Sequence, residues 1–223
     1  MAAVLQLLFP QRCVGCARSG AQLCEACRRA LPRLGWPCCE RCGAPGAWPV
    51  RRCVECAGRR LAFASARAAV AYDERVRRLV GAWKEHGLRR LAVAAAELVV
   101  EVVAPPDVEA LTYVPAEHDR TLRRGDHPAQ RLARELGERW ELPLGAFLRR
   151  ARAAPPQRGS SLAERRRNVR GSFAPAAEAP RRIALVDDVY TSGATAHAAA
   201  SALRKGGSRH VEVVTFARTL RLR

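Results

Sequence analysis

The sequence predicts an α/β protein, in which a parallel sheet flanked by helices follows a small cysteine-rich module. Three observations predict this class. All nine cysteines lie before residue 57, so the chain begins with a segment of distinct composition. After residue 60, short apolar segments alternate with helical ones, which is typical of a parallel sheet covered on both faces. One apolar strand is followed by an acidic pair, a loop of small residues and an Ala-rich helix, an order suited to ligand binding.

The size and charge of the chain limit its class. Its 223 residues, 48% of them hydrophobic, can hold one domain of about 150 residues and a small module. The formal net charge of +18 predicts binding to a polyanion, because clustered cations release counterions from phosphate backbones. Only Lys84 and Lys205 are lysines among the 39 basic residues, however, so a GC-rich coding sequence explains the arginine excess equally well.

The basic charge is uneven along the chain. Residues 120–182 hold sixteen arginines against six acidic residues, and we expect an anionic ligand near this stretch. Residues 1–10 lack the charged start and the cleavage site of a secretory signal. No run approaches the ~20 apolar residues of a membrane helix, so we expect a cytoplasmic protein without membrane insertion.

Eight of the nine cysteines form four CxxC pairs, and Cys38 is left over. A CxxC loop presents two thiolates to one tetrahedral metal with little strain, whereas disulfides are disfavoured in a reducing cytoplasm. The alternative, a set of buried or redox-active cysteines, does not explain the regular spacing. The pairs are Cys13 with Cys16, Cys24 with Cys27, Cys39 with Cys42, and Cys53 with Cys56.

Two CxxC pairs in succession form a zinc ribbon, and this arrangement occurs twice. We expect two structural zinc ions, because four sulfur ligands close the coordination sphere and stabilise a segment too small to fold alone. Sequential pairing is expected for a ribbon, although the spacing also allows crossed pairs. The side chains of Trp36 and Trp48 either cover the core of this module or stack, with nearby arginines, on a nucleic acid or a protein partner.

Periodicity divides the rest of the chain into strands and helices. Asp73 is suited to cap the first helix, which has apolar residues at helical spacing. We place a domain boundary after residue 59, between a zinc-ribbon module at 1–59 and an α/β domain at 60–223. We expect strands at 66–72, 111–114, 183–186 and 211–216, helices at 74–87, 91–103, 128–140 and 195–205, an arginine-dense helix or loop at 158–171, and a connector at 174–180.

The segment Ile183–Thr195, IALVDDVYTSGAT, combines the parts of a sugar-phosphate site. A buried strand delivers Asp187 and Asp188 to the carboxyl end of the sheet, where two carboxylates accept hydrogen bonds from vicinal hydroxyls such as ribose O2 and O3. The following loop offers backbone N–H groups and three hydroxyls just before a helix, which is an anion site. Gly193 lets the backbone come close to a phosphate. A pentose 5-phosphate fits both halves at once.

The alternative interpretation of this segment is a tight turn whose Asp pair caps a helix or binds a structural cation. An Asp pair or a TSG turn on its own is compatible with many roles. The ordered combination of strand, acidic pair, loop and helix favours a phosphoribosyl group.

The same segment resembles the phosphoribosyl pyrophosphate motif of type I phosphoribosyltransferases, in which four apolar residues precede DD and a TSGAT-like loop. The whole chain resembles the ComF family, in which a cysteine-rich zinc ribbon precedes such a domain. It departs from the family pattern at Asp126, His127 and Pro128, where an aromatic residue and Asn are usual. Besides the loop and the CxxC pairs, the match covers Lys84 in WKEHG, the pattern VP…R…RG…Q…LA at 114–133, and Gln157, Leu162, Arg166 and Asn168.

The resemblance implies a type I phosphoribosyltransferase-like parallel sheet flanked by helices, preceded by a double zinc ribbon. It implies that Asp187 and Asp188 hold the ribose and that Lys84 lies near the pyrophosphate of a Mg-bound ligand. Arg123 and Arg124, with Arg120, belong to a segment that would close over the diphosphate, or else form an ordinary solvated charge run. We assign no role to His86, His118 and His127. The implied phosphate-binding residues are Tyr190, Thr191, Ser192, Gly193, Ala194 and Thr195.

Two functions follow from this resemblance. The first is a Mg-dependent phosphoribosyltransferase, a pentosyl-transferring glycosyltransferase whose acceptor the sequence does not name, linked to nucleotide metabolism or DNA uptake. The second is a non-catalytic accessory factor of competence that binds single-stranded DNA or a helicase partner and uses the pocket for phosphoribosyl pyrophosphate or a nucleotide. A third option is regulation of transcription. The intact acidic pair favours ligand binding in each case.

Overall fold

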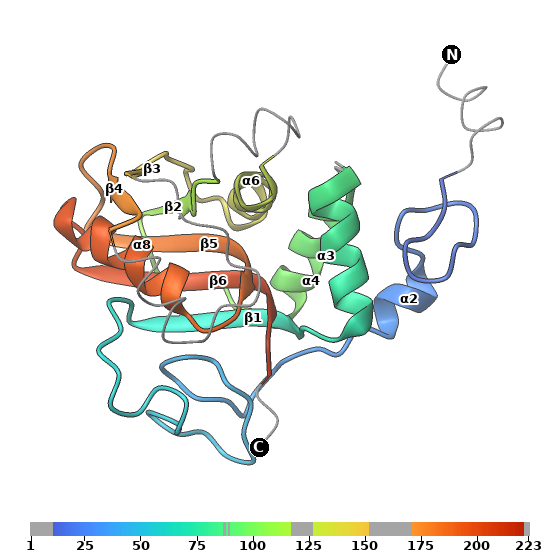
Figure 1. Ribbon diagram of the computed structural model, residues 1–223, viewed down its shortest axis with the longest axis horizontal. Helices are drawn as coiled ribbons and strands as arrows, with labels where there is room; N and C mark the ends of the chain where they lie inside the picture. Colours follow the sequence, from blue (N-terminus) through green and yellow to red (C-terminus); the bar gives the residue numbers. More distant parts are fainter. Residues whose placement is uncertain (1–10, 87, 89, 117–126, 152–170, 221–223) are drawn as a thin grey trace.

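A four-stranded parallel sheet forms the centre of the protein, as the sequence predicts (Figure 1). The computed structural model describes residues 11–86, 88, 90–116, 127–151 and 171–220. The strands are β1 (Ser65–Ala71), β2 (Ala110–Tyr113), β5 (Arg182–Tyr190) and β6 (His210–Arg218). They lie in the order β1-β6-β5-β2, so that the first strand of the sheet pairs with the last.

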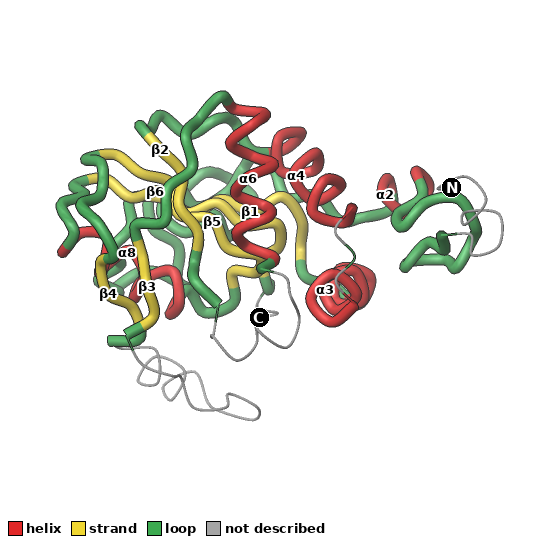
Figure 2. Tube along the Cα trace, turned by 90° about the horizontal axis from the view of Figure 1, so that it is seen from above, coloured by secondary structure: helices red, strands yellow, loops and turns green. Residues whose placement is uncertain are grey.

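Helices cover both faces of this sheet (Figure 2). On one face, α4 (Arg90–Val102) contacts β1 and β6, and α6 (Pro128–Trp140) contacts β2 and β5. On the other face, α8 (Ala194–Lys205) contacts β5 and β6. α3 (Glu74–His86) packs beside α4. The predicted layers of an α/β fold are confirmed.

Alternation along β5 separates the two cores of the protein. Ala184 and Val186 belong to the core that contains α4 and α6, whereas Ile183 and Leu185 belong to the core that contains α8. All four side chains are fully buried. A continuous apolar run is what a central strand of a parallel sheet requires, because both of its faces are covered.

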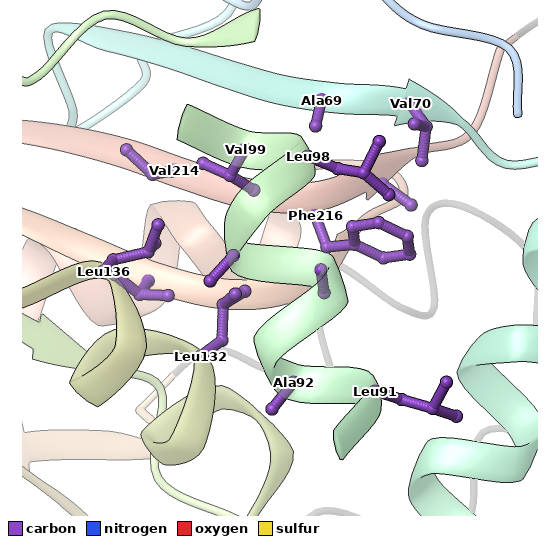
Figure 3. Close-up of a cluster of buried hydrophobic side chains, with 14 of the residues drawn as sticks. Ala69, Val70, Leu91, Ala92, Leu98, Val99, Leu132, Leu136, Val214 and Phe216 are labelled. Carbon is purple, nitrogen blue, oxygen red and sulfur yellow. The ribbon is translucent and has the colours of Figure 1, made fainter. Parts of the chain in front are cut away.

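The larger core fixes α3 and α4 against the sheet (Figure 3). Leu98 of α4 lies beside Phe216 of β6, and Val99 of α4 lies beside Val214 of the same strand. Phe216 also contacts Trp83 of α3 edge to face, with 6.4 Å between ring centroids. Burying one such side chain contributes about 1.5–3 kcal/mol. This packing holds α3, and with it the neighbouring Lys84, at the edge of the sheet.

Local signals explain where the helices begin and end. The Asp73 carboxylate accepts a hydrogen bond from the backbone N–H of Val76 at 2.9 Å, which confirms Asp73 as the cap of α3. α6 begins at Pro128, as predicted, and His127 is its N-cap. α8 ends at Gly206, in agreement with the predicted stop.

Three strands differ from the prediction. β3 (Leu148–Arg150) and β4 (Phe173–Pro175) form a short antiparallel pair, although a connector is expected from residue 174. Proline hides this pair in the sequence, because it is tolerated only at the edges of sheets. β5 runs four residues beyond its predicted end at Val186, since β6 continues to pair with it as far as Tyr190. Residues 152–170, which include most of the arginine-dense segment, lie outside the described residues.

The cysteine-rich segment divides into two halves that lie apart (Figure 1). The first half, with the short helix α2 (Glu25–Arg29), lies beyond α3 and α4. β1 and β2 are the two edge strands of the sheet. The second half lies beside β1, and so at the edge opposite β2. Among the helices of the described residues, none is long and apolar enough to cross a membrane.

Candidate functional site

The acidic pair lies near the carboxyl end of β5. Asp187 is paired in register with Thr215 of β6, and its Oδ1 accepts a hydrogen bond from the backbone N–H of Asp188 at 2.9 Å. Asp187 is half-buried and Asp188 is buried. Because the two residues are consecutive on a strand, their side chains leave the backbone in different directions, and the bond between them holds the first carboxylate in place.

Lys84 of α3 reaches this pair. Its Nζ forms an ion pair with Oδ2 of Asp188. Burial acts against both charges, but the Asp188 carboxylate raises the pKa of Lys84 and the Lys84 ammonium lowers the pKa of Asp188. Burial, followed by the negative charge of Asp188, raises the pKa of Asp187 well above its usual value. The pair therefore retains a proton on Asp187 to a higher pH than an isolated aspartate does.

The predicted phosphate loop follows β5 directly. Gly193 has φ +72° and precedes the first residue of α8, so the N–H groups of the first helical turn have no acceptor one turn earlier in the helix. The Ser192 hydroxyl accepts the N–H of Ala194 at 3.3 Å. Thr191 is exposed, and Thr195 is partly exposed on the first turn. The loop thus combines hydroxyls, free backbone donors and a helix N-terminus in one place.

The Tyr190 side chain packs beneath this loop. Its ring contacts Phe63 edge to face, with centroids 6.3 Å apart, and burial raises the pKa of its hydroxyl to about 12. A methyl group added to Gly193 would lie 2.3 Å from that hydroxyl. The loop can therefore keep this shape only with glycine at 193.

Not every predicted site residue can be placed. Arg120, Arg123 and Arg124 lie outside the described residues. His127, to which the sequence assigns no role, lies at the carboxyl end of β2, with its ring edge-on to Tyr113 at 5.0 Å between centroids. Its Nε2 accepts the backbone N–H of Ala116 at 2.7 Å, and burial lowers its pKa. An isolated histidine in a polar loop gives no sequence signal for such a position.

The eight paired cysteines form two tetrads, each of which joins sequential CxxC pairs. Within each tetrad the four sulfur atoms lie within 4.8 Å of one another. Four sulfurs at about 2.3 Å from a tetrahedral zinc ion lie about 3.8 Å apart. The observed distances of 3.6 Å between Cys16 and Cys24 and 3.5 Å between Cys42 and Cys53 fit this geometry. The tetrads are Cys13, Cys16, Cys24 and Cys27 in the first ribbon, and Cys39, Cys42, Cys53 and Cys56 in the second.

Backbone N–H groups prepare one sulfur in each tetrad for metal binding. The N–H of Cys24 donates to Cys13 Sγ at 3.4 Å, and the N–H of Cys53 donates to Cys39 Sγ at 3.3 Å. Burial favours the neutral thiol, but these donors lower the pKa of Cys13 to about 6 and that of Cys39 to about 7. The donor sets therefore suit two structural zinc ions, in agreement with the prediction.

The first ribbon is attached to α4 by surface ion pairs. Arg28 donates to Glu101 at 2.8 Å, and Arg33 donates to the other oxygen of the same carboxylate at 2.9 Å. Both arginine side chains are about a quarter exposed. Exposed pairs of this kind contribute about 0–1 kcal/mol each, and Leu31 is in addition buried in the same hydrophobic core as α3 and α4.

The second ribbon is attached through a buried arginine that the sequence analysis missed. Arg218, at the end of β6, is only 1% exposed. It donates to the carbonyl oxygen of Cys42, and to Glu55 Oε2 at 2.7 Å. Its guanidinium lies over the Tyr190 ring, 4.8 Å from the centroid. Arg59, just after this ribbon, donates to the carbonyl oxygen of Ser192 at 2.8 Å.

The two tryptophans of the ribbon segment do not cover its core. Trp36 is 67% exposed and Trp48 is 70% exposed. Arg51 and Arg52, in the second ribbon, are also exposed. Of the two roles open for these aromatic side chains, the structure excludes that of core cover.

Comparison with known proteins adds relatives for both parts of the chain. The model of the double zinc ribbon domain matches residues 4–59. DNA utilization protein YhgH of Salmonella typhi is 29% identical, over 89% of this chain and 91% of that protein. Among solved structures, orotate phosphoribosyltransferase from Aeropyrum pernix is 24% identical with a TM-score of 0.37, over 66% of this chain and 67% of that chain.

A second solved structure, a glutamine phosphoribosylpyrophosphate amidotransferase from B. subtilis, is 21% identical with a TM-score of 0.36, and this chain covers only 25% of its length. Competence protein F of Haemophilus influenzae is 30% identical over 231 residues, which cover 94% of this chain and 98% of that protein. On this nearly full-length relationship, the chain belongs to the ComF family.

Proposed function

We propose that the protein binds phosphoribosyl pyrophosphate with Mg²⁺ at the carboxyl edge of the sheet. The single observation that carries this proposal is the continuity of β5 with the loop before α8. One end of this segment presents the Asp187 and Asp188 carboxylates, and the other presents the donors of residues 191–195. A ribose with a 5-phosphate needs acceptors for its O2 and O3 hydroxyls and donors for its phosphate, in this order.

Lys84 gives this site a cation that binding would release. In the free protein it neutralises Asp188. When ribose hydroxyls donate to Asp188, they replace part of that interaction, and the ammonium becomes available to the diphosphate on C1. The oxygen-rich donor set of two carboxylates and a diphosphate is of the kind that Mg²⁺ prefers.

The same arrangement supports a phosphoribosyl transfer. A nitrogen nucleophile forms a bond to C1 of the ribose, the bond from C1 to the diphosphate oxygen breaks, and pyrophosphate leaves with the electron pair. Catalysis then consists of positioning and of neutralising the leaving group, and Lys84 is suited to the second task. The nucleophile loses its proton to solvent or to a nearby base.

Calorimetry with phosphoribosyl pyrophosphate and Mg²⁺ tests the binding proposal. We expect saturable binding by the wild type and at least a tenfold loss in the variants Asp187→Asn and Asp188→Asn, because each removes a charged acceptor. Asp107→Asn is the matched control, since Asp107 is an exposed aspartate paired with Arg182 far from the loop in sequence. Equal binding by all four proteins, or none by the wild type, would sink the proposal.

A separate assay tests transfer. Pyrophosphate release is measured with a panel of purine and pyrimidine bases, with the wild type and with Lys84→Met. Release that depends on a base and falls in the variant supports the enzyme. Tight binding without release from any base contradicts transfer and leaves a ligand-binding accessory factor.

A second candidate function is binding of single-stranded DNA by the second ribbon. The exposed rings of Trp36 and Trp48 and the exposed Arg51 and Arg52 favour it, because bases stack on aromatic side chains while arginines contact phosphates. The names of the relatives, a competence protein and a DNA utilization protein, agree with such a role.

Fluorescence anisotropy with an unstructured oligonucleotide tests this candidate. Trp48→Ala is expected to cost about 1–3 kcal/mol of binding free energy through lost stacking. Arg51→Gln is expected to reduce the slope of log affinity against log salt by roughly 0.7, the contribution of one phosphate contact. Arg29→Gln, an exposed arginine of the first ribbon, serves as the control. Equal effects at Arg29 and Arg51 would mean a nonspecific response to net charge.

A further inference from the structure

The second ribbon and the phosphate loop share a set of buried contacts that the proposed function does not use. Arg218 lies between them, with Cys42 and Glu55 on the ribbon side and Tyr190 on the loop side. At 1% exposure, its side chain is among the largest fully buried ones of the described residues. A buried guanidinium is costly unless each partner stays in place, so these partners depend on one another.

The loop side of this set reaches the predicted ligand donors directly. Tyr190 is paired in register with Arg218, and its carbonyl oxygen accepts the N–H of Thr219 at 3.0 Å. Its hydroxyl lies beside Gly193, where it occupies the space that any larger residue would need. A shift of the Tyr190 ring therefore changes the backbone position at 193, in the middle of the loop.

A second contact joins the ribbon to the loop independently. Arg59 follows the last cysteine of the ribbon, Cys56, by three residues and donates to the Ser192 carbonyl oxygen at 2.8 Å. This bond directs the carbonyl of Ser192 toward the ribbon. The N–H of Gly193, which belongs to the same planar peptide unit, is then oriented by a bond from outside the loop.

The ribbon side depends on metal. Cys42 supplies both a sulfur to the second tetrad and the carbonyl oxygen that Arg218 contacts. Glu55 lies between two ligands of the same tetrad, Cys53 and Cys56. Without metal, a segment of this size loses its fold, and Arg218 loses both partners. The first ribbon has no comparable link in the described residues, since its ion pairs go to α4.

We propose that the second zinc ribbon holds the loop of residues 191–195 in its ligand-binding shape through Arg218 and Arg59, so that loss of metal from this ribbon weakens phosphate binding. Arg218 and Arg59 are positioning residues in this account. The ligand itself rests on the proposed function, but the dependence of the loop on the ribbon does not. Coupling between the two sites is reciprocal, so bound ligand also raises the affinity of the second ribbon for its metal.

Hydrogen exchange of the free protein tests the coupling without ligand. Cys53→Ser and Cys16→Ser remove one sulfur from the second and the first tetrad, respectively. We expect Cys53→Ser to speed exchange of the amides of residues 191–196 by about tenfold or more, and Cys16→Ser to change it by less than about twofold. Amides of α4 serve as the internal reference for overall stability. Equal loop exchange in the two variants would overturn the proposal.

Two milder substitutions keep the test valid where a cysteine variant fails to fold. Arg59→Met removes one bond to the loop from a partly exposed side chain, and Glu55→Gln keeps the shape of the Arg218 partner without its charge. Each is expected to speed loop exchange about threefold or more, with α4 amides unchanged. Unchanged loop exchange in both variants would contradict the proposal.

Titration with Mg²⁺ and phosphoribosyl pyrophosphate then separates this inference from the proposed function. If the wild type binds, we expect Cys53→Ser and Arg59→Met to lose affinity by about tenfold, within the usual range of coupling between sites, and Cys16→Ser to retain it. If the wild type does not bind, the proposed function fails, while the exchange results still decide whether the ribbon holds the loop.

Discussion

Lys84 and Asp188 form an ion pair that joins α3 to the carboxyl end of β5. The two residues lie 104 positions apart in the sequence, and they meet because Trp83, next to Lys84, is buried against Phe216 of the neighbouring strand. Packing of one residue thus places the charge of the next. The Lys84 ammonium lowers the pKa of Asp188. Burial and the negative charge of Asp188 raise the pKa of Asp187, against the opposing effect of Lys84.

Lys84→Met is expected to destabilise the free protein by about 1–2 kcal/mol, because Asp188 would keep a buried charge without a partner. This value lies between those for exposed and for buried pairs, since the Lys84 side chain is about a third exposed. The variant should also lose affinity for phosphoribosyl pyrophosphate, while Lys205→Met, on α8, should retain both properties. Thermal unfolding and calorimetry measure the two effects. A variant as stable as the wild type would show that the ion pair contributes nothing.

Asp187→Asn is expected to stabilise the free protein at neutral pH. The folded pKa of Asp187 lies above the unfolded value of about 3.9. Between these two values the folded state binds more protons than the unfolded chain, so the wild type loses stability as pH rises through this window. The variant does not titrate and avoids this loss. The melting temperature of the variant should rise increasingly above that of the wild type as the pH is raised from 3 to 8. A difference that does not change with pH would contradict a raised pKa of Asp187 in the folded state.

Ligand affinity should rise with pH over the same window. Ribose hydroxyls donate more strongly to an ionised carboxylate than to a protonated one, so binding favours release of the proton that Asp187 retains. Below the pKa of Asp187, the association constant should increase by about tenfold per pH unit. Calorimetry in two buffers of different ionisation enthalpy measures the released proton. Proton uptake on binding would contradict the release of a proton from Asp187 and would mean that another group titrates.

Gly193→Ala is expected to destabilise the protein more than Gly58→Ala. Both glycines have positive φ, at +72° and +70°, and alanine there costs about 1–2 kcal/mol at either position. Only at Gly193 does the added methyl also meet Tyr190, which should cost about 1–3 kcal/mol more. Unfolding of the two variants in urea isolates the steric effect. Equal losses would mean that the Tyr190 ring moves aside freely.

Metal analysis should find about two zinc ions per chain, because each tetrad supplies four sulfurs. Cys16→Ser and Cys53→Ser should each lower this number by about one. A strong chelator should reduce the melting temperature, since the metal contributes directly to the folding of each ribbon. Protein purified under reducing conditions without any zinc would refute the assignment.

The elements of the α/β domain could be predicted because their signals are local. Asp73 and Pro128 mark helix starts by their own chemistry, and the run from Ile183 to Val186 is apolar at every position. Asp187 and the loop after it are predictable for the same reason, since strand, acids and loop are continuous in sequence. Each of these features needs fewer than twenty consecutive residues to be recognised.

The contacts between distant segments could not be predicted in this way. Arg218 stands between an alanine and a threonine near many other arginines, and nothing local marks it as buried. Its partners at Cys42 and Glu55 lie more than 160 residues earlier in the chain. The sequence also did not predict whether Trp36 and Trp48 cover the core of the ribbon module. Their exposure depends on how the ribbon packs against β1.

The strand order has a consequence for biosynthesis. β1 pairs with β6, so that Ser65 lies opposite Glu212, and no other strand of the described sheet borders β1. During translation, which adds about 5–20 residues per second, β1 and the ribbon before it are made long before β6, so β1 has no strand to pair with until β6 is complete. Arg218 arrives at the end of that same strand. The cysteines of the nascent chain can therefore bind metal several seconds before Arg218 is made and the contacts between the second ribbon and the loop of residues 191–195 can form.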